Sequence, residues 1–576
     1  MMRMSLVFLI LPLTSCQGAH PDRWVEDRIL TERIEEYLGA RHRFYPVEAT
    51  QAGDHSHDAE LGSFRPEALR GRLSWLHDFR QKLLGVDLTK LSRSSYVDAL
   101  WLTSLVKAEI HELDAVAAWR KSPAFYGRLI CAGATGLVSG EPSEPRITAL
   151  LSRLRQVPSL LEEARSNMEA PSRVVLEEDL AELGRCRRIL LGLPAVVGKT
   201  VTGKLIALGE QSREAAGALQ ELIRYIELRL LPQAPESFAL GPETLRLRLL
   251  YQEMEDTPLA TIRQLAEGEL GKARSQMEEI ARRLGPDRRL PRILADLTRE
   301  QVSAPEVIAF TEAVLLRIHD FAAARDLTSG IGDRRIQVIE TPPYLRDGFV
   351  ATLHVPDPLE EDPRGAYLML SLPEPGWPAR RREAHLRSLT HDALQLAAMG
   401  EIYPGKYLQH IFRSQNGSRL RRLLISEANR KGWSRYVQQM LLEEGYDAQN
   451  LPLRLIRLHR WVMDLSRLVM AIRLHSQETS LGAAARFFQE QAFLTRQRAE
   501  KEARAVATHP DLLKAALGKL QILKLRQDYL HTAVSSGKLR DFHDAFLSAG
   551  VIPIRLVGLL LLANDQTTIL DVEALR

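Results

Sequence analysis

The sequence predicts a mainly helical protein with one small β-sheet near the centre of the chain. Three observations favour this fold class. Hydrophobic residues make up 45% and charged residues 26% of the 576 residues, which is typical of a globular protein and excludes a disordered chain or a multi-span membrane protein. Aromatic residues make up only 6%, which disfavours a β-sandwich or barrel. Apolar residues recur at three- and four-residue steps over most of the chain, which is the period of an amphipathic helix.

The N-terminal segment is predicted to be a signal peptide. Arg3 precedes a compact apolar run at 6–11 that is too short to span a bilayer. The following Leu13-Thr14-Ser15-Cys16 resembles the bacterial lipobox. This resemblance implies that residues 1–15 are removed, that Cys16 is acylated, and that 16–23 form a short tether to a membrane. An ordinary secretion signal with an incidental cysteine is the alternative.

The predicted anchor places the protein in a bacterial cell envelope, facing the periplasm or the exterior. Gln17 is compatible with transfer to an outer membrane where the cell has one. The formal net charge of +4 is not gathered into a basic block, so the sequence gives no support for nucleic-acid binding. Cys131 and Cys186 are the other two cysteines, and their spacing leaves open whether they pair.

The helical period is clearest at 260–285, where Gly285-Pro286 ends an apolar face. Similar periodicity predicts helices at 24–39, 95–120, 145–168, 205–230, 305–325, 380–400, 417–445, 453–476 and 481–505. Between 334 and 372, short β-prone runs separated by Pro and Gly predict the small sheet, with strands at 335–339, 349–355 and 367–372. No repeat or linker appears, so residues 24–574 are predicted to form a single domain, with a C-terminal helical half at 380–574.

The run from Gly400 to Gln409, GEIYPGKYLQ, resembles the hallmark of the bacterial "domain of unknown function 885" proteins, His-Glu-x-x-Pro-Gly-His followed by x-Leu-Gln. Five further segments match the family's motifs in the same order along the chain. They are 46–53; 432–436, which corresponds to Glu-Gly-Trp-Ala-x-Tyr; His475, which corresponds to the last residue of Val-Asp-x-Gly-x-His; Arg504 with Gly518; and 542–553. The resemblance implies a large zincin-like fold of the gluzincin type and, in active relatives, a zinc peptidase.

The departures from the family pattern concern the metal ligands. The resemblance implies that relatives hold zinc through the two motif histidines and the Glu before Gly-Trp, where this chain has Gly400, Lys406 and Lys431. Glycine offers no donor atom, an ammonium has no free lone pair, and two cations repel a divalent ion. We therefore expect no metal and no other cofactor. Glu401, the family's general base, is expected to be a vestigial catalytic residue that pairs with Lys406 or Lys431. A replacement metal site built from His391, Asp392 and Glu401 is the less favoured alternative.

Three functions stay open. We favour an envelope pseudo-peptidase that no longer hydrolyses and acts by binding a peptide or protein. The alternatives are an active metal-dependent peptidase with non-standard ligands, and a structural lipoprotein whose cleft is filled. Residues that match the family motifs are candidates for a retained cleft, although packing of the central helices explains them equally well; they are Tyr403, Trp433, Tyr436, His475 and Arg504.

Overall fold

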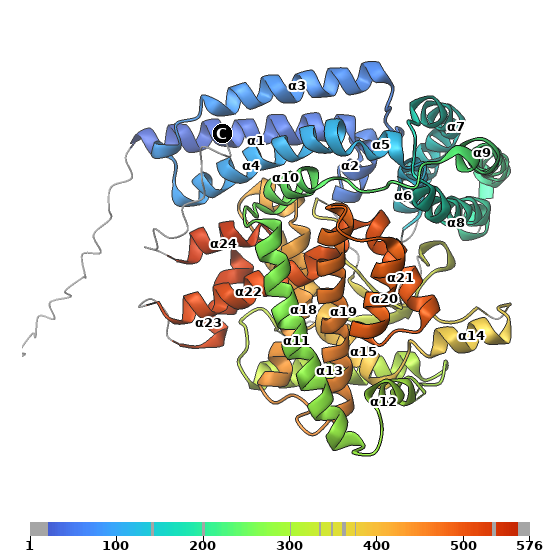
Figure 1. Cartoon of the computed structure of the whole chain (residues 1–576). Coiled ribbons are helices and arrows are strands. Elements are labelled where there is room, and N and C mark those ends of the chain that lie inside the picture. Colours follow the sequence, from blue (N-terminus) through green and yellow to red (C-terminus); the bar gives the residue numbers. More distant parts are fainter. Residues whose placement is uncertain are drawn as a thin grey trace, which may run out of the picture.

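The computed structural model describes residues 21–139, 143–197, 202–299, 301–332, 336–346, 350–359, 365–374, 376–532 and 537–562 (Figure 1). The predicted signal peptide and Cys16 lie outside these residues. Within the described ranges, no helix is long and apolar enough to cross a membrane.

The described chain consists mainly of helices, with three strands in its middle. The helices before the sheet are α1 (Pro21–Phe44), α2 (Pro46–Ala52), α3 (Pro66–Leu84), α4 (Arg93–His111), α5 (Ala118–Lys121), α6 (Ala124–Val138), α7 (Glu144–Asn167), α8 (Arg173–Val197), α9 (Leu205–Tyr225), α10 (Pro242–Glu253), α11 (Leu259–Leu284), α12 (Leu290–Leu297) and α13 (Val307–Ala324). The helices after it are α14 (Ala379–Leu386), α15 (His391–Glu401), α16 (Lys406–Ser414), α17 (Arg419–Leu423), α18 (Glu427–Glu443), α19 (Leu451–His475), α20 (Leu481–Ala492), α21 (Arg496–Thr508), α22 (Lys514–Leu530), α23 (Leu539–Ser548) and α24 (Ile554–Leu561).

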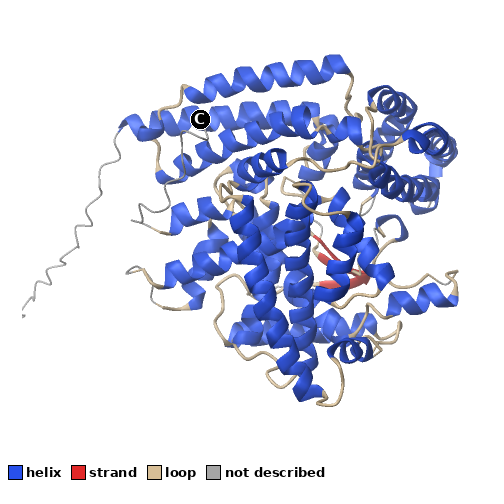
Figure 2. Cartoon of the chain, in the orientation of Figure 1, coloured by secondary structure: helices blue, strands red, loops and turns tan. Residues whose placement is uncertain are grey.

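The small sheet lies where the sequence predicts it. Its strands are β1 (Gln337–Glu340), β2 (Ala351–His354) and β3 (Tyr367–Leu370), in the order β1-β3-β2. The central strand β3 pairs in parallel with β1 and antiparallel with β2. Leu368 and Leu370 on β3 are fully buried, as expected for a strand with a neighbour on each side. The prediction of a mainly helical protein with one small central sheet is confirmed (Figure 2).

Four of the predicted helices are wrong in extent, because each contains two α-helices. The predicted helix 95–120 contains α4 and α5, 380–400 contains α14 and α15, 417–445 contains α17 and α18, and 481–505 contains α20 and α21. Thr390 and Ser426 cap α15 and α18 by accepting a hydrogen bond from the backbone N–H three residues on. Phe493 ends α20 in the left-handed region, at φ 57°. Apolar periodicity continues across these breaks, so the period alone does not reveal them.

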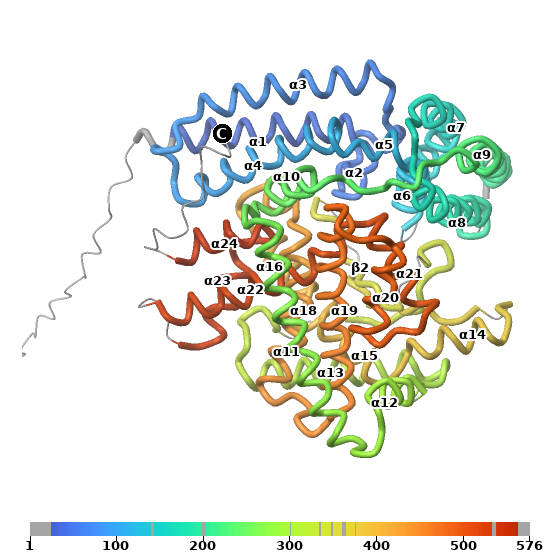
Figure 3. Tube along the Cα trace, viewed as in Figure 1, coloured from blue at the N-terminus to red at the C-terminus, as the bar shows by residue number. Residues whose placement is uncertain are grey.

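The core has two clusters of buried hydrophobic side chains. The larger one joins the N-terminal helices to the sheet and to α15, α16 and α18. The smaller one centres on α19 and includes residues of α11, α20 and α21. Helices α11 and α19 run side by side through this part of the molecule (Figure 3), and α18, α19 and α22 pack against one another. These central helices carry most of the residues discussed below.

The two described cysteines are free thiols on neighbouring helices, Cys131 on α6 and Cys186 on α8. A hydrogen bond with Cys131, together with burial, raises the pKa of the Cys186 thiol above its ordinary value. Cys186 also donates a hydrogen bond to the Gly127 carbonyl at 3.3 Å.

Candidate functional site

The site is built around the turn between α15 and α16. Glu401 is the last residue of α15 and Lys406 the first residue of α16, and the Lys406 Nζ lies 2.7 Å from the Glu401 Oε1. Both side chains are largely buried, with exposed fractions of 17% and 20%. The expected ion pair is therefore present, and Lys406 is the partner. Lys431 instead pairs with Glu427 on α18, at 3.1 Å.

Gly400 is packed so closely that it has no room for a side chain. A Cβ atom there would lie 2.5 Å from the Ser434 Oγ and 2.7 Å from the Gln438 Nε2, both on α18. Gln438 is held in place because its Nε2 donates a hydrogen bond to the Leu396 carbonyl at 2.6 Å. Gly405 lies equally close to Gly400, since a Cβ at 405 would be 2.2 Å from the Gly400 carbonyl oxygen. Position 400 thus lacks a donor atom, and α18 fills the space that a side chain there would need.

Arginines surround the Glu401–Lys406 pair. Burial lowers the pKa of Lys406, and Arg430 and Arg435 lower it further against the opposing effect of Glu401. Arg430 forms an ion pair with Glu427 at 2.8 Å. On α19, burial and then Arg435 lower the pKa of Arg460 to about 10. Half-buried cations at this density oppose the binding of a divalent cation.

Asp464 on α19 is the most deeply buried carboxylate of this group. Its side chain is 1% exposed and lies 2.6 Å from the Arg435 Nε and 3.3 Å from the Arg467 Nη1. Arg467 also pairs with Glu502 on α21 at 2.9 Å. Burial alone would raise the pKa of Asp464, but Arg435 and Arg467 outweigh burial and the pKa lies below its ordinary value. Asp464 therefore stays ionised and links α18, α19 and α21 electrostatically.

The comparison with known proteins agrees with the sequence motifs. A family model described as "Bacterial protein of unknown function (DUF885)" matches residues 46–559. The chain belongs to this family. No curated protein sequence matches the chain.

Two solved structures of similar proteins share the fold. One is described as a "putative lipoprotein of unknown function" from Shewanella oneidensis, with a TM-score of 0.78 and 19% identity over 93% of this chain and 99% of that chain. The other, a "putative lipoprotein" from Colwellia psychrerythraea, has a TM-score of 0.77 and 17% identity over 94% of this chain and 98% of that chain.

Three aromatic residues that match DUF885 motifs are buried and make internal contacts. The Trp433 Nε1 donates a hydrogen bond to the Pro404 carbonyl at 2.8 Å, which ties α18 to the turn after Glu401. The Tyr436 hydroxyl lies 2.8 Å from the His543 Nε2, and the His543 Nδ1 donates to the Leu327 carbonyl at 2.7 Å. Tyr403 is 2% exposed. These contacts show that the three residues pack the helices around the site.

The other two matched residues lie elsewhere. His475 ends α19, about 22 Å along the helix from Arg460 at 1.5 Å per residue. Its Nδ1 accepts a hydrogen bond from the Leu240 N–H, its Nε2 donates to the Val506 carbonyl, and burial lowers its pKa to about 4. Arg504 on α21 pairs with Glu177 on α8. The structure therefore does not bring His475 together with Glu401, and it directs Arg504 toward the N-terminal helices.

The residues of this DUF885 chain do not fit a zinc centre. Among the described residues, no group of three His, Cys, Asp or Glu side chains is placed to hold a metal ion. His385 and His391, which the periodicity places on one helix, lie on the separate helices α14 and α15. The His391 ring instead packs edge-on against Phe310 on α13, with ring centroids 4.7 Å apart.

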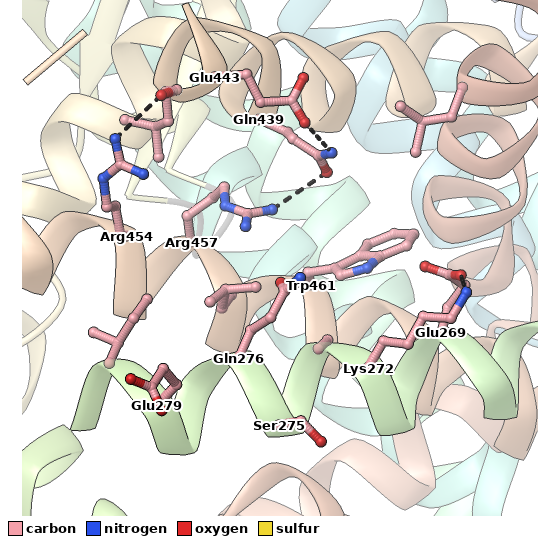
Figure 4. Close-up of a pocket in the computed structure, with 15 residues that line it drawn as sticks. Glu269, Lys272, Ser275, Gln276, Glu279, Gln439, Glu443, Arg454, Arg457 and Trp461 are labelled. Carbon is pink, nitrogen blue, oxygen red and sulfur yellow. Dashed lines mark hydrogen bonds and ion pairs between the residues drawn. The ribbon is translucent and has the colours of Figure 1, made fainter. Parts of the chain in front are cut away.

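A pocket of about 620 Å³ lies between α11, α18, α19 and α22 and is separate from the predicted site residues (Figure 4). Trp461 and Arg457 on α19 face Gln276 and Lys272 on α11 across it. The Arg457 Nη1 donates to the Gln439 Oε1 at 3.4 Å. Trp461, which lines the pocket, directly follows Arg460 on α19. No residue of the turn at Glu401 lines the pocket.

Sequence reasoning missed most of the charged residues around Glu401. Arg435, Arg460 and Asp464 are distant from the turn in sequence, and no pattern local to Glu401 points to them. One signal was present in the sequence: Ser434 stands where the DUF885 motif Glu-Gly-Trp-Ala-x-Tyr has alanine, and its Oγ is one of the two atoms that close the space beside Gly400.

Proposed function

We propose that this protein is a lipid-anchored envelope member of the DUF885 family with a zincin-like scaffold, and that it binds a peptide or protein segment without hydrolysing it. The observation that carries this proposal is the Glu401–Lys406 ion pair at 2.7 Å beside a filled Gly400 position. A general base must reach its substrate water, and the Glu401 carboxylate is instead occupied by the Lys406 ammonium. The same packing leaves no donor set for the zinc that would polarise the water.

The envelope location is part of the proposal. It is supported by the lipobox-like Leu13-Thr14-Ser15-Cys16 and by the description of two proteins of the same fold as putative lipoproteins. Acylation at Cys16 would tether the protein to one membrane surface, and the domain at 24–574 would act in the adjoining compartment.

A peptide-retention experiment tests the proposed activity. The purified protein is incubated with a pool of short peptides, with and without added zinc, and bound and free peptides are analysed by mass spectrometry. We expect intact peptides to be retained and no cleavage products to form. Zinc-dependent cleavage that is lost in Glu401→Gln would establish the active-peptidase alternative. If no peptide is retained, the structural alternative, which the filled space beside Gly400 favours, replaces this proposal.

Restoration of the metal ligands gives a further prediction. We expect the combined variant Gly400→His, Lys406→His and Lys431→Glu to bind zinc measurably but with low affinity. The reason is that Ser434 and Gln438 occupy the space that an imidazole at position 400 needs. Adding Ser434→Ala and Gln438→Ala should increase zinc affinity by about tenfold or more, which is about 1.4 kcal/mol. Isothermal titration calorimetry measures both.

The control carries alanine at 400, 406 and 431 on the same Ser434→Ala, Gln438→Ala background, so that it has the space without the ligands. If the variant with all five substitutions folds but binds no more zinc than this control, positions 400, 406 and 431 do not correspond to the family's zinc ligands.

A further inference from the structure

The helices around Glu401 carry more positive than negative side chains. The cations are Lys406, Arg413, Arg430, Lys431, Arg435, Arg460 and Arg467, and the carboxylates are Glu401, Glu427, Asp464 and Glu502. We call these residues the basic cluster. Their positions on the helices place them together: Lys406 and Arg413 lie two turns apart on α16, Lys431 and Arg435 lie one turn apart on α18, and Arg460, Asp464 and Arg467 share one face of α19. Arg435 of α18 pairs with Asp464 of α19 at 2.6 Å, which joins two of these faces. The pKa shifts agree with this grouping, because Arg430 acts on Arg413 and Lys406, and Arg435, Asp464 and Glu401 act on Arg460.

Every carboxylate of the basic cluster is already engaged in an ion pair. Glu401 pairs with Lys406, and Glu427 is shared by Arg430 and Lys431. Asp464 is shared by Arg435 and Arg467, and Glu502 also pairs with Arg467. The seven cations of the cluster therefore share four carboxylates, each of which is already paired.

Arg413 and Arg460 are the cations left over. Both are half-buried, and among the described residues neither guanidinium forms an ion pair with a carboxylate within 4.0 Å. Burial, and after it a neighbouring arginine, lower the pKa of each to about 10. A half-buried charge without a counter-ion is costly, and an anion that reaches it is bound correspondingly well.

The basic cluster remains open to solvent. The side chains of Lys406, Arg435 and Arg430 are 20%, 25% and 33% exposed. A guanidinium presents a planar fork of N–H donors that matches the two oxygens of a carboxylate or a phosphate. The N–H donors of the basic cluster therefore favour an oxyanion. The family resemblance implies that relatives bind a cation at the same place.

We propose that the basic cluster is an oxyanion site that receives a carboxylate of the bound peptide, so that the protein prefers acidic peptides. This inference rests on the proposed peptide-binding function, because peptides supply carboxylates through acidic side chains and C-termini. Arg460 and Arg413 are the residues that contact the anion, and Glu401 keeps Lys406 in place beside them.

Binding of three probes tests the inference at low ionic strength, by calorimetry on the full chain. The probes are a short glutamate-rich peptide, the same peptide with glutamine in place of glutamate, and inorganic phosphate. We expect the glutamate peptide to bind about tenfold more tightly than the glutamine peptide. Arg460→Met and Arg413→Met should remove this preference. The exposed Arg283 on α11 provides the matched control, and Arg283→Met should retain the preference.

The outcomes separate the two proposals. If both peptides bind alike, or if Arg460→Met changes the preference no more than Arg283→Met, the oxyanion site is wrong and peptide binding stands. A third result is that neither peptide binds, but phosphate raises the melting temperature of the wild type and not that of Arg460→Met. The basic cluster is then a site for free anions, and the proposed peptide function is wrong. If no probe binds, both are wrong. Because Arg460→Met and Arg413→Met each remove an unneutralised charge, we expect both variants to fold.

Discussion

Replacing Gly518 with alanine is expected to reduce the free energy of unfolding by at least about 3 kcal/mol, because a Cβ there would overlap the neighbouring helix. The Cβ would lie 1.8 Å from the Ala428 carbonyl oxygen on α18. Gly432 on α18 is also in close contact from the other side, since a Cβ there would be 2.4 Å from the Gly518 carbonyl carbon. The backbones of α18 and α22 therefore touch at this pair of glycines, and urea unfolding measures the cost of separating them.

Gly268 provides the matched control for this prediction. It lies on the exposed face of α11, and a Cβ there would meet nothing within 4 Å. Gly268→Ala should leave stability unchanged or raise it by about 0.5–1 kcal/mol, because alanine favours the helix more than glycine does. A Gly518→Ala variant as stable as Gly268→Ala would contradict the close approach of α18 and α22. The site depends on this approach, because Ser434, Arg435 and Gln438 reach it from α18.

Replacing Asp464 with asparagine is expected to destabilise the protein by about 3–5 kcal/mol. Removing the carboxylate of a buried ion pair leaves the charge of its partner uncompensated. Asp464 is 1% exposed and neutralises Arg435 and Arg467, and without it the basic cluster gains a further unbalanced charge. Asparagine keeps the size of the side chain, so the effect measures charge. Thermal and urea unfolding at low salt should both show it.

The control for the Asp464 prediction is Asp528→Asn on α22. Asp528 pairs with Lys524 four residues before it, on the surface, at 2.9 Å. Exposed pairs of this kind contribute about 0.3–0.5 kcal/mol, so the control should change stability little. Equal losses in the two variants would show that Asp464 does not hold the basic cluster together.

Much of the fold was predictable because helical periodicity is a local property of the sequence. The helix predicted at 260–285 is α11, Leu259–Leu284, and the three strands fall inside the predicted region. The breaks before α15, α18 and α21 were not predictable from the period. They depend on local backbone features, such as the caps at Thr390 and Ser426, that interrupt a helix without interrupting its apolar face.

The candidate site was predictable only in part. The pairing of Glu401 with a lysine was expected because the family resemblance implies that Lys406 and Lys431 stand near it, and Lys406 is five residues away in sequence. The filling of the space at Gly400 depends on Gln438, and the charge excess depends on Arg460; these residues reach the site from α18 and α19. Only the packing of three helices brings them together, and no local pattern in the sequence encodes that packing.

The zinc content of the purified protein tests the central claim most directly. The full chain is equilibrated with zinc, dialysed, and measured by inductively coupled plasma mass spectrometry beside Glu401→Gln. Gly400, Lys406 and Lys431 stand where the family resemblance implies zinc ligands, and none of them can donate a lone pair to zinc, so we expect far less than one zinc per chain in both proteins. One zinc per chain in the wild type, together with peptide cleavage that is lost in Glu401→Gln, would contradict the account.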